Sequence, residues 1–110
     1  MFLLKVFQYY FRIFLDHVDG TFVVRKSQHG GVHCPYTLTL HFQKRCYNLN
    51  IRKISDRRYA LGKRKNNEMV FGTVNELINY HKSNKLLLMD NTGQVKGQTL
   101  LTNYPRGSYC

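Results

Sequence analysis

Two alternating runs separated by three residues constrain the fold of this chain more than any other feature. Residues 36–42 (YTLTLHF) and 46–52 (CYNLNIR) each place polar and apolar side chains at alternate positions. Successive side chains of a β-strand point to opposite faces, so each run predicts a strand with one apolar face. The three-residue interval at 43–45 favours an antiparallel hairpin. The sequence therefore predicts an antiparallel sheet at the centre of the fold.

Further strands are expected on both sides of this hairpin. Residues 21–27 (TFVVRKS) form a β-branched run that follows an Asp-Gly turn signal. Residues 59–61 predict a short strand and residues 100–105 a closing strand, whereas the apolar run 86–89 fits either a helix or a strand. Three segments rich in glycine, basic or polar residues are expected to be loops: 28–35, 62–67 and 90–98.

Two helices are predicted. Thr73 and Glu76 have the spacing of a capping box, in which each side chain can bond the other residue's backbone N–H. A stripe at helical spacing follows, which predicts a helix over 73–82: Val74, Leu77, Ile78 and His81. The apolar segment 3–16 is interrupted by one polar stripe, which favours a helix packed on the sheet, with a peripheral membrane helix as the alternative. It is too short to span a bilayer, so no stable membrane insertion is expected.

These elements define an α+β fold with a central antiparallel sheet flanked by two α-helices. The sheet is built from about 21–27, 36–42 and 46–53, with the helices 3–16 and 73–82 on opposite faces. We expect the second helix to pack against the side that carries Leu38, Leu40 and Ile51. At 110 residues, the chain has the length of one domain.

Charge and cysteine content restrict the function. The chain has 17 Lys and Arg against six Asp and Glu, a formal charge of +11. Such an excess indicates an anionic partner: nucleic acid, a lipid headgroup, or a phosphorylated or acidic peptide. Three cysteines without paired spacing favour a reducing compartment, and they form no zinc-ligand pattern with the histidines. No acid–base pair or nucleophile elbow is visible, so an enzyme, a metal and a cofactor are not expected.

The polar residues of the predicted strands gather on one face of the sheet. If the faces coincide, that side carries Arg25, Ser27, Thr37, Asn48 and Asn50. A guanidinium is a rigid two-pronged donor, and hydroxyl and loop N–H groups can reach the remaining oxygens of a phosphate. The face therefore fits a phosphate dianion. The alternative is that Arg25 pairs with a carboxylate or reaches solvent.

Residues 20–27 (GTFVVRKS) resemble the GTFLVRES signature of Src homology 2 (SH2) domains. Four later segments resemble further pieces of that family in the same order: 35–40, 47–52, 71–80 and 100–105. The resemblance covers 19–105 and leaves 1–18 as a divergent N-terminal helix and 106–110 as a C-terminal tail. Within the family, residues 59–68 followed by Phe71 and Gly72 are most similar to the B-cell linker and lymphocyte cytosolic adaptor group.

The resemblance implies a non-catalytic SH2 module of a cytoplasmic signalling adaptor. Such a module binds phosphotyrosine in an extended peptide and recruits tyrosine-phosphorylated partners, here in immune-receptor-type signalling. A monomer that binds no nucleic acid is expected. The alternative is a basic α+β nucleic-acid-binding domain, which would use the +11 charge and the aromatic residues.

The resemblance also assigns roles residue by residue. Arg25 matches the phosphate-binding arginine, Ser27 and Gln28 open the phosphate-binding loop, and Thr37 lies on the strand behind it. Asn48 stands where many members carry histidine, and Asn50 where many carry lysine, so one common phosphate contact is missing. Further residues are expected to set the preference for residues after the phosphotyrosine: Leu49, which replaces a common tyrosine, Leu61, Gly62, Leu87 and Leu88.

The N-terminus departs from the family pattern. The usual tryptophan is absent, because the chain has no Trp. The first-helix arginine that assists the strand arginine would fall near Val6, with Lys5 and Arg12 as the nearest cations. Three explanations stay open: a neighbouring cation substitutes, phosphate affinity is reduced, or residues 1–16 are not the native start of the domain.

Overall fold

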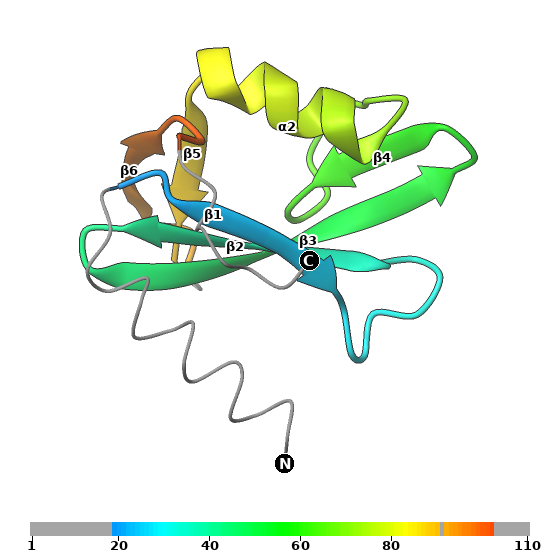
Figure 1. The fold of residues 1–110 in the computed structure, drawn as a ribbon, viewed down its shortest axis with the longest axis horizontal. Helices are drawn as coiled ribbons and strands as arrows, with labels where there is room; N and C mark the ends of the chain where they lie inside the picture. The colour runs from blue at the N-terminus through cyan, green and yellow to red at the C-terminus, as the bar shows by residue number, and fades with distance from the viewer. Residues whose placement is uncertain (1–18, 91, 103–110) are drawn as a thin grey trace.

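The computed structural model describes residues 19–90 and 92–102. In chain order the elements are β1 (Phe22–Lys26), β2 (Tyr36–Phe42), β3 (Arg45–Ser55), β4 (Arg58–Leu61), α2 (Val74–Ser83), β5 (Leu86–Met89) and β6 (Val95–Thr99). The first four strands form one sheet in the order β1-β2-β3-β4, and β5 pairs with β6 in a second sheet (Figure 1). The predicted helix at 3–16 and tail at 106–110 lie outside the described residues. Within these ranges no helix is long and apolar enough to cross a bilayer.

The predicted central sheet is confirmed, and all of its neighbouring strands run antiparallel. The connection between β2 and β3 is one residue shorter than expected, because Arg45 already pairs with Phe42. Gln43 and Lys44 form the turn with φ values of 51° and 61°. Positive φ at both central residues is typical of the tight hairpin turn whose twist matches that of the strands. This turn fixes the register along the whole length of β2 and β3.

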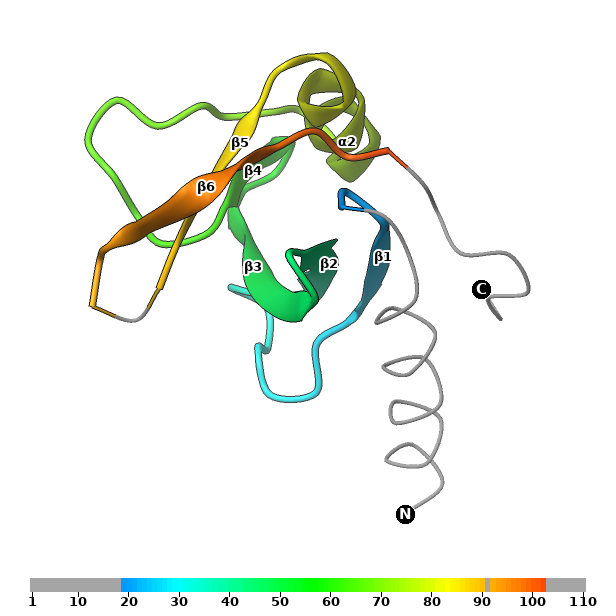
Figure 2. The same ribbon diagram turned by 90° about the vertical axis from the view of Figure 1, so that its left-hand side faces the viewer.

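The apolar face of the sheet carries the core and is covered by α2 (Figures 1 and 2). Leu38, Leu40 and Ile51 are completely buried there and form one cluster with Leu77 of α2. Burying each such side chain contributes roughly 1.5–3 kcal/mol. The predicted placement of the second helix against this side of the sheet is therefore correct.

The start of α2 follows the predicted capping pattern with one difference. Thr73 is the N-cap, and its Oγ1 accepts a hydrogen bond from the backbone N–H of Glu76 at 3.1 Å. The Glu76 carboxylate reaches past Thr73 and accepts from the backbone N–H of Gly72 at 2.9 Å. Both bonds satisfy N–H groups at the start of the helix, where no carbonyl is available.

The C-terminal part of the described chain differs from expectation. The predicted loop at 90–98 is wrong in its second half, because residues 95–98 belong to β6, which ends at Thr99; residues 100–102 of the predicted closing strand lie in no strand. The hairpin turns at Asp90, whose carboxylate accepts from the backbone N–H groups of Thr92 and Gln94. β6 packs at Gly97, where an added Cβ would lie 2.6 Å from the Phe42 ring. Because β6 is largely exposed and polar, its sequence lacks the alternation that marks the central strands.

Candidate anion-binding site

Three side chains of the predicted polar face lie in one row across the sheet. Arg25 of β1 pairs with Thr37 of β2, which pairs on its other side with Asn50 of β3. Thr39 and Asn48 form the next pair on the same face, two residues along each strand. Residues that pair directly across antiparallel strands point to the same face. The ladder thus brings together a cation, hydroxyls and amides.

All of these side chains except Thr39 line an open hollow of about 500 Å³, called here the first hollow. Its lining consists of Arg25, Ser27, Gln28, His29, Gly30, Cys34, Thr37, Asn48 and Asn50. The six residues predicted for phosphate binding all belong to this set. Among the described residues that line the hollow, none is acidic.

Two short hydrogen bonds orient the polar groups of the first hollow. The hydroxyls of Ser27 and Thr37 lie 2.7 Å apart, so one donates to the other and its partner keeps a free proton. Thr39 donates from Oγ1 to the Asn48 side-chain oxygen, also at 2.7 Å. Thr37 and Thr39 are buried, whereas Asn48 is exposed. The buried hydroxyls thus hold the more exposed groups in place.

The loop after β1 forms the rim of the first hollow. Its ends are joined by a hydrogen bond from the Ser27 N–H to the Pro35 carbonyl, and Cys34 N–H donates to the Gly30 carbonyl. A Cβ on Gly30 would lie 1.8 Å from the Cys34 carbonyl oxygen, so glycine is needed at this close approach. His29, Gly30 and Cys34 were not predicted to line the site. The Gly-Gly pair at 30–31 indicated a loop but not which of its residues turn inward.

The residues predicted to set peptide preference lie away from the first hollow. Leu49 and Leu61 share the face of Ile51 and pack against the core cluster. Gly62 follows β4 and donates its N–H to the Asn50 carbonyl. Leu87 and Leu88 lie on β5; Leu87 is 38% exposed, whereas Leu88 is 1% exposed and belongs to the core.

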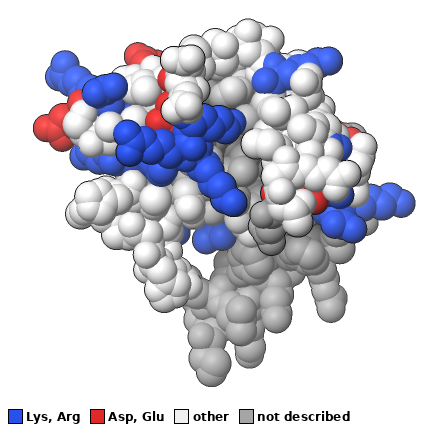
Figure 3. Space-filling model, turned by 180° about the vertical axis from the view of Figure 1, so that it is seen from behind, with Lys and Arg blue, Asp and Glu red and all other residues white. Residues whose placement is uncertain are grey.

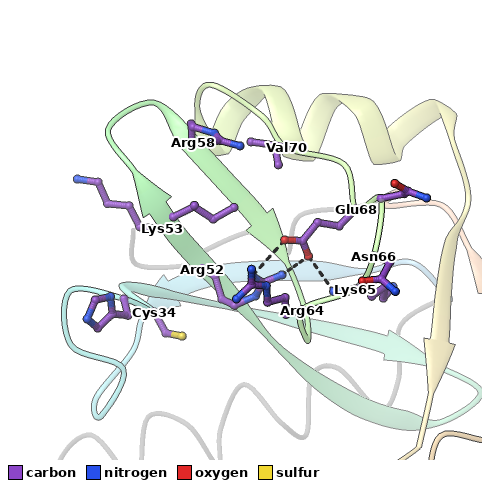
Figure 4. A pocket seen from close by; sticks show the side chains of 12 residues that line it. Cys34, Arg52, Lys53, Arg58, Arg64, Lys65, Asn66, Glu68 and Val70 are labelled. Atoms are coloured by element: carbon purple, nitrogen blue, oxygen red, sulfur yellow. Dashed lines mark hydrogen bonds and ion pairs between the residues drawn. The ribbon is translucent and has the colours of Figure 1, made fainter.

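A second hollow of about 770 Å³ lies between the β3–β4 hairpin and the chain that follows it (Figure 4). Arg52 donates from Nε to the Gly62 carbonyl at 2.6 Å, and its guanidinium makes a two-pronged pair with the Glu68 carboxylate. The hydrogen bond from Arg52 is the main cause that lowers the pKa of Glu68. This pair was not predicted, since residues 16 positions apart have no local spacing that would reveal it.

The fold thus places a strand arginine among hydroxyl and amide side chains, in a hollow on the polar side of an antiparallel sheet whose apolar face carries a helix. Comparison with known protein families identifies the family of this fold. The family model described as SH2 domain matches residues 11–81, more than half of the chain. The chain belongs to the SH2 domain family.

Three relatives that this chain matches are each much longer than the chain. Mouse B-cell linker protein is 45% identical over 84 residues, which are 76% of this chain and 18% of that protein. Chicken B-cell linker protein is 38% identical over 90 residues, 81% of this chain and 16% of that protein. Mouse lymphocyte cytosolic protein 2 is 34% identical over 93 residues, 84% of this chain and 17% of that protein. The chain thus spans less than a fifth of the length of these relatives, and the predicted resemblance is confirmed.

Proposed function

We propose that this chain is a phosphotyrosine-binding module whose first hollow takes the phosphate. Membership of the SH2 family supports the ligand class. The row of Arg25, Thr37 and Asn50 in one hollow is the observation that carries the assignment to these residues. A phosphate monoester carries nearly two negative charges at neutral pH, and a guanidinium can bind two of its oxygens in parallel.

Each group of the first hollow has a separate role in this proposal. Arg25 supplies the charge and the fork, and the Ser27–Thr37 pair supplies a hydroxyl proton. The Asn48 amide lies beside the tyrosyl ring, and Gln28 contributes from the loop. Asn50, which has no charge, contributes polarity only, so phosphate affinity depends more heavily on Arg25 than in a site that contains a lysine there.

The parent protein is proposed to be a non-catalytic signalling adaptor. The similarity to B-cell linker protein and lymphocyte cytosolic protein 2 supports this, together with the match of the family model. In that role the module acts as a monomer in the cytoplasm and recruits tyrosine-phosphorylated partners in immune-receptor-type signalling. The nucleic-acid alternative rests on the net charge and the aromatic content, and the family assignment does not favour it.

A titration tests the proposed ligand. The 110-residue chain is titrated at physiological salt with a phosphotyrosyl peptide, with its unphosphorylated twin and with single-stranded RNA. We expect binding of the phosphorylated peptide only. The same titration is repeated with Arg25→Lys. This change keeps the positive charge but removes the two parallel N–H donors of the guanidinium. Losing one of two parallel hydrogen bonds to a charged group costs about 1.5–3 kcal/mol, so affinity should fall at least roughly tenfold.

Lys26→Gln is the matched control for Arg25→Lys. Lys26 is the neighbouring cation on the same strand, but it is exposed and points to the opposite face. Its loss should leave peptide affinity within about twofold, because an exposed charge contributes little. Melting temperatures of both variants exclude unfolding as the cause. Equal affinity of Arg25→Lys and the parent protein would refute the assigned pocket.

A further inference from the structure

The second hollow adjoins the first and shares a wall with it. Cys34 lines both, and His33 lines the second. A hydrogen bond from the Lys53 N–H to the His33 carbonyl, 2.8 Å long, attaches this wall to β3. The wall that contains His33 and Cys34 is therefore attached on both sides. The bond from the Ser27 N–H to the Pro35 carbonyl attaches it beside β1 and β2, and the Lys53–His33 bond attaches it to β3. A ligand seated in the first hollow lies next to the second.

The second hollow is strongly basic. Five of its lining side chains are cationic: Arg52, Lys53, Arg58, Arg64 and Lys65. The one acidic residue among its described lining residues, Glu68, is only 16% exposed and is bound by Arg52. Among the described residues, Arg58, Arg64 and Lys65 have no acidic side chain within ion-pair distance, and Lys53 contacts only the fully exposed Asp56. Figure 3 shows Lys and Arg gathered in a band on the face of the molecule seen from behind.

We propose that the second hollow binds another anionic group, a carboxylate or a second phosphate ester, of the same peptide that places its phosphotyrosine in the first hollow. This inference rests on the proposed function. Once phosphotyrosine is bound, neighbouring side chains of the peptide are present at a high effective concentration. The cations then gain an anionic partner without a second loss of translational freedom. The continuity of the two hollows favours a peptide over a separate macromolecule.

Arg64 and Lys65 supply the most direct contacts. Both side chains are exposed, and the hydrogen bond from Lys65 to Glu68 is donated by the backbone N–H, which a substitution leaves intact. Arg52, by contrast, is committed to Glu68 and Gly62 and positions the wall. The double variant Arg64→Gln/Lys65→Gln thus removes two charges from the second hollow and preserves the Arg52–Glu68 pair.

A matched control removes the same charge elsewhere. Lys44 and Arg45 lie at the β2–β3 turn, at the opposite end of the ladder from the Tyr36–Ile51 pair beside the hollows. The control variant is Lys44→Asn/Arg45→Gln, with asparagine chosen because it tolerates the positive φ of residue 44. Both double variants lower the net charge equally, so a general charge effect acts on both alike.

The experiment compares three phosphotyrosyl peptides at physiological salt: one with neutral flanks, one with glutamates on both sides, and one with a second phosphotyrosine. We expect the two acidic peptides to bind the parent chain about three- to tenfold more tightly than the neutral one. Arg64→Gln/Lys65→Gln should abolish this gain and leave the neutral peptide within twofold. The control variant should retain the gain.

Each contrary result has a distinct meaning. An equal loss of the gain in both variants, or no gain in the parent chain, overturns the second site. The last measurement is the binding of the parent chain and of both variants to vesicles of phosphatidylcholine with phosphatidylserine. If the 64/65 variant loses vesicle binding while the acidic-peptide gain persists, the surface serves a membrane and the proposal is wrong. Failure of the neutral phosphopeptide to bind better than its unphosphorylated twin refutes the proposed function itself.

Discussion

The Ser27 and Thr37 hydroxyls, 2.7 Å apart, join the loop after β1 to the middle row of the sheet. Thr37 is directly opposite Arg25 in the β1–β2 ladder, so this bond places the loop hydroxyl beside the guanidinium. The loop's position over the first hollow thus depends on a buried threonine that the ladder itself fixes.

Thr37→Val should weaken phosphopeptide binding while keeping the shape of the side chain. The change removes the hydroxyl that pairs with Ser27 and leaves one hydrogen bond unmade. Such a bond contributes about 1 kcal/mol, which corresponds to roughly a fivefold loss of affinity. A double-mutant cycle with Ser27→Ala, measured by titration calorimetry, should show strong non-additivity because the two hydroxyls contact each other. Strictly additive losses would show that they act independently.

Leu49→Tyr should change the preference for residues after the phosphotyrosine without changing phosphate binding. Leu49 lies on the opposite face from Asn48 and Asn50, and its packing against the core leaves the phosphate hollow untouched. We expect roughly tenfold weaker binding of peptides with an apolar residue after the phosphotyrosine. Phenyl phosphate should bind both proteins equally. Identical profiles of the two proteins in a phosphopeptide library would contradict the role of Leu49.

Arg52→Gln should loosen the segment that follows β4. Glu68 and the Gly62 carbonyl both lose their Arg52 donor, so fewer contacts attach the segment to β3, among them the bond from the Gly62 N–H to the Asn50 carbonyl. Trypsin should then cleave faster at the exposed Lys63, Arg64 and Lys65. The control is Arg58→Gln, a β4 arginine without an ion-pair partner among the described residues, whose digestion should match the parent protein. Unchanged cleavage in Arg52→Gln would show that other contacts hold the segment.

Stability should fall as the pH drops through the range of histidine titration, and His81 should account for part of the fall. Burial among Phe71, Tyr80 and the core is the main cause that lowers the pKa of His81. The unfolded chain therefore takes up a proton near pH 6.5, at which the folded chain still resists it. The contribution of neutral His81 to the free energy of unfolding is complete above pH 6.5 and is lost as the pH falls below that value.

Thermal melts from pH 7.5 to 5.5 measure this effect against His81→Asn. Asparagine can still donate to the Asn84 carbonyl that accepts from the His81 ring. The variant melts at a lower temperature throughout, but its melting temperature should change less with pH. Parallel pH curves of the two proteins would exclude His81 as the titrating group.

The sequence predicted the central sheet well because alternation and a short turn are local signals. It also placed Arg25, Thr37 and Asn50 on one face, since that follows from alternation once the register is set. β6 escaped prediction because its exposed side chains are polar on both faces, and Gly97 is required only by the Phe42 ring. No local pattern marks such a contact between segments far apart in the chain.

The second hollow could not have been predicted for the same reason. Its cations come from β3, from β4 and from the segment after β4, and the sequence shows them only as scattered basic residues. The partnership of Arg52 with Glu68 depends on how that segment folds back over the sheet. Charge composition indicated an anionic partner, but only the fold shows where the charge is concentrated.

β3 contributes to both hollows, through Asn50 in the first and Arg52 in the second. These residues share a face of one strand and lie two positions apart, which corresponds to roughly 7 Å at about 3.3 Å per residue. A continuous strand cannot lengthen or shorten this interval. In the two-site binding proposed above, the walls of the two hollows therefore keep a fixed separation, and a peptide would be selected by the interval between its anionic groups as well as by their number.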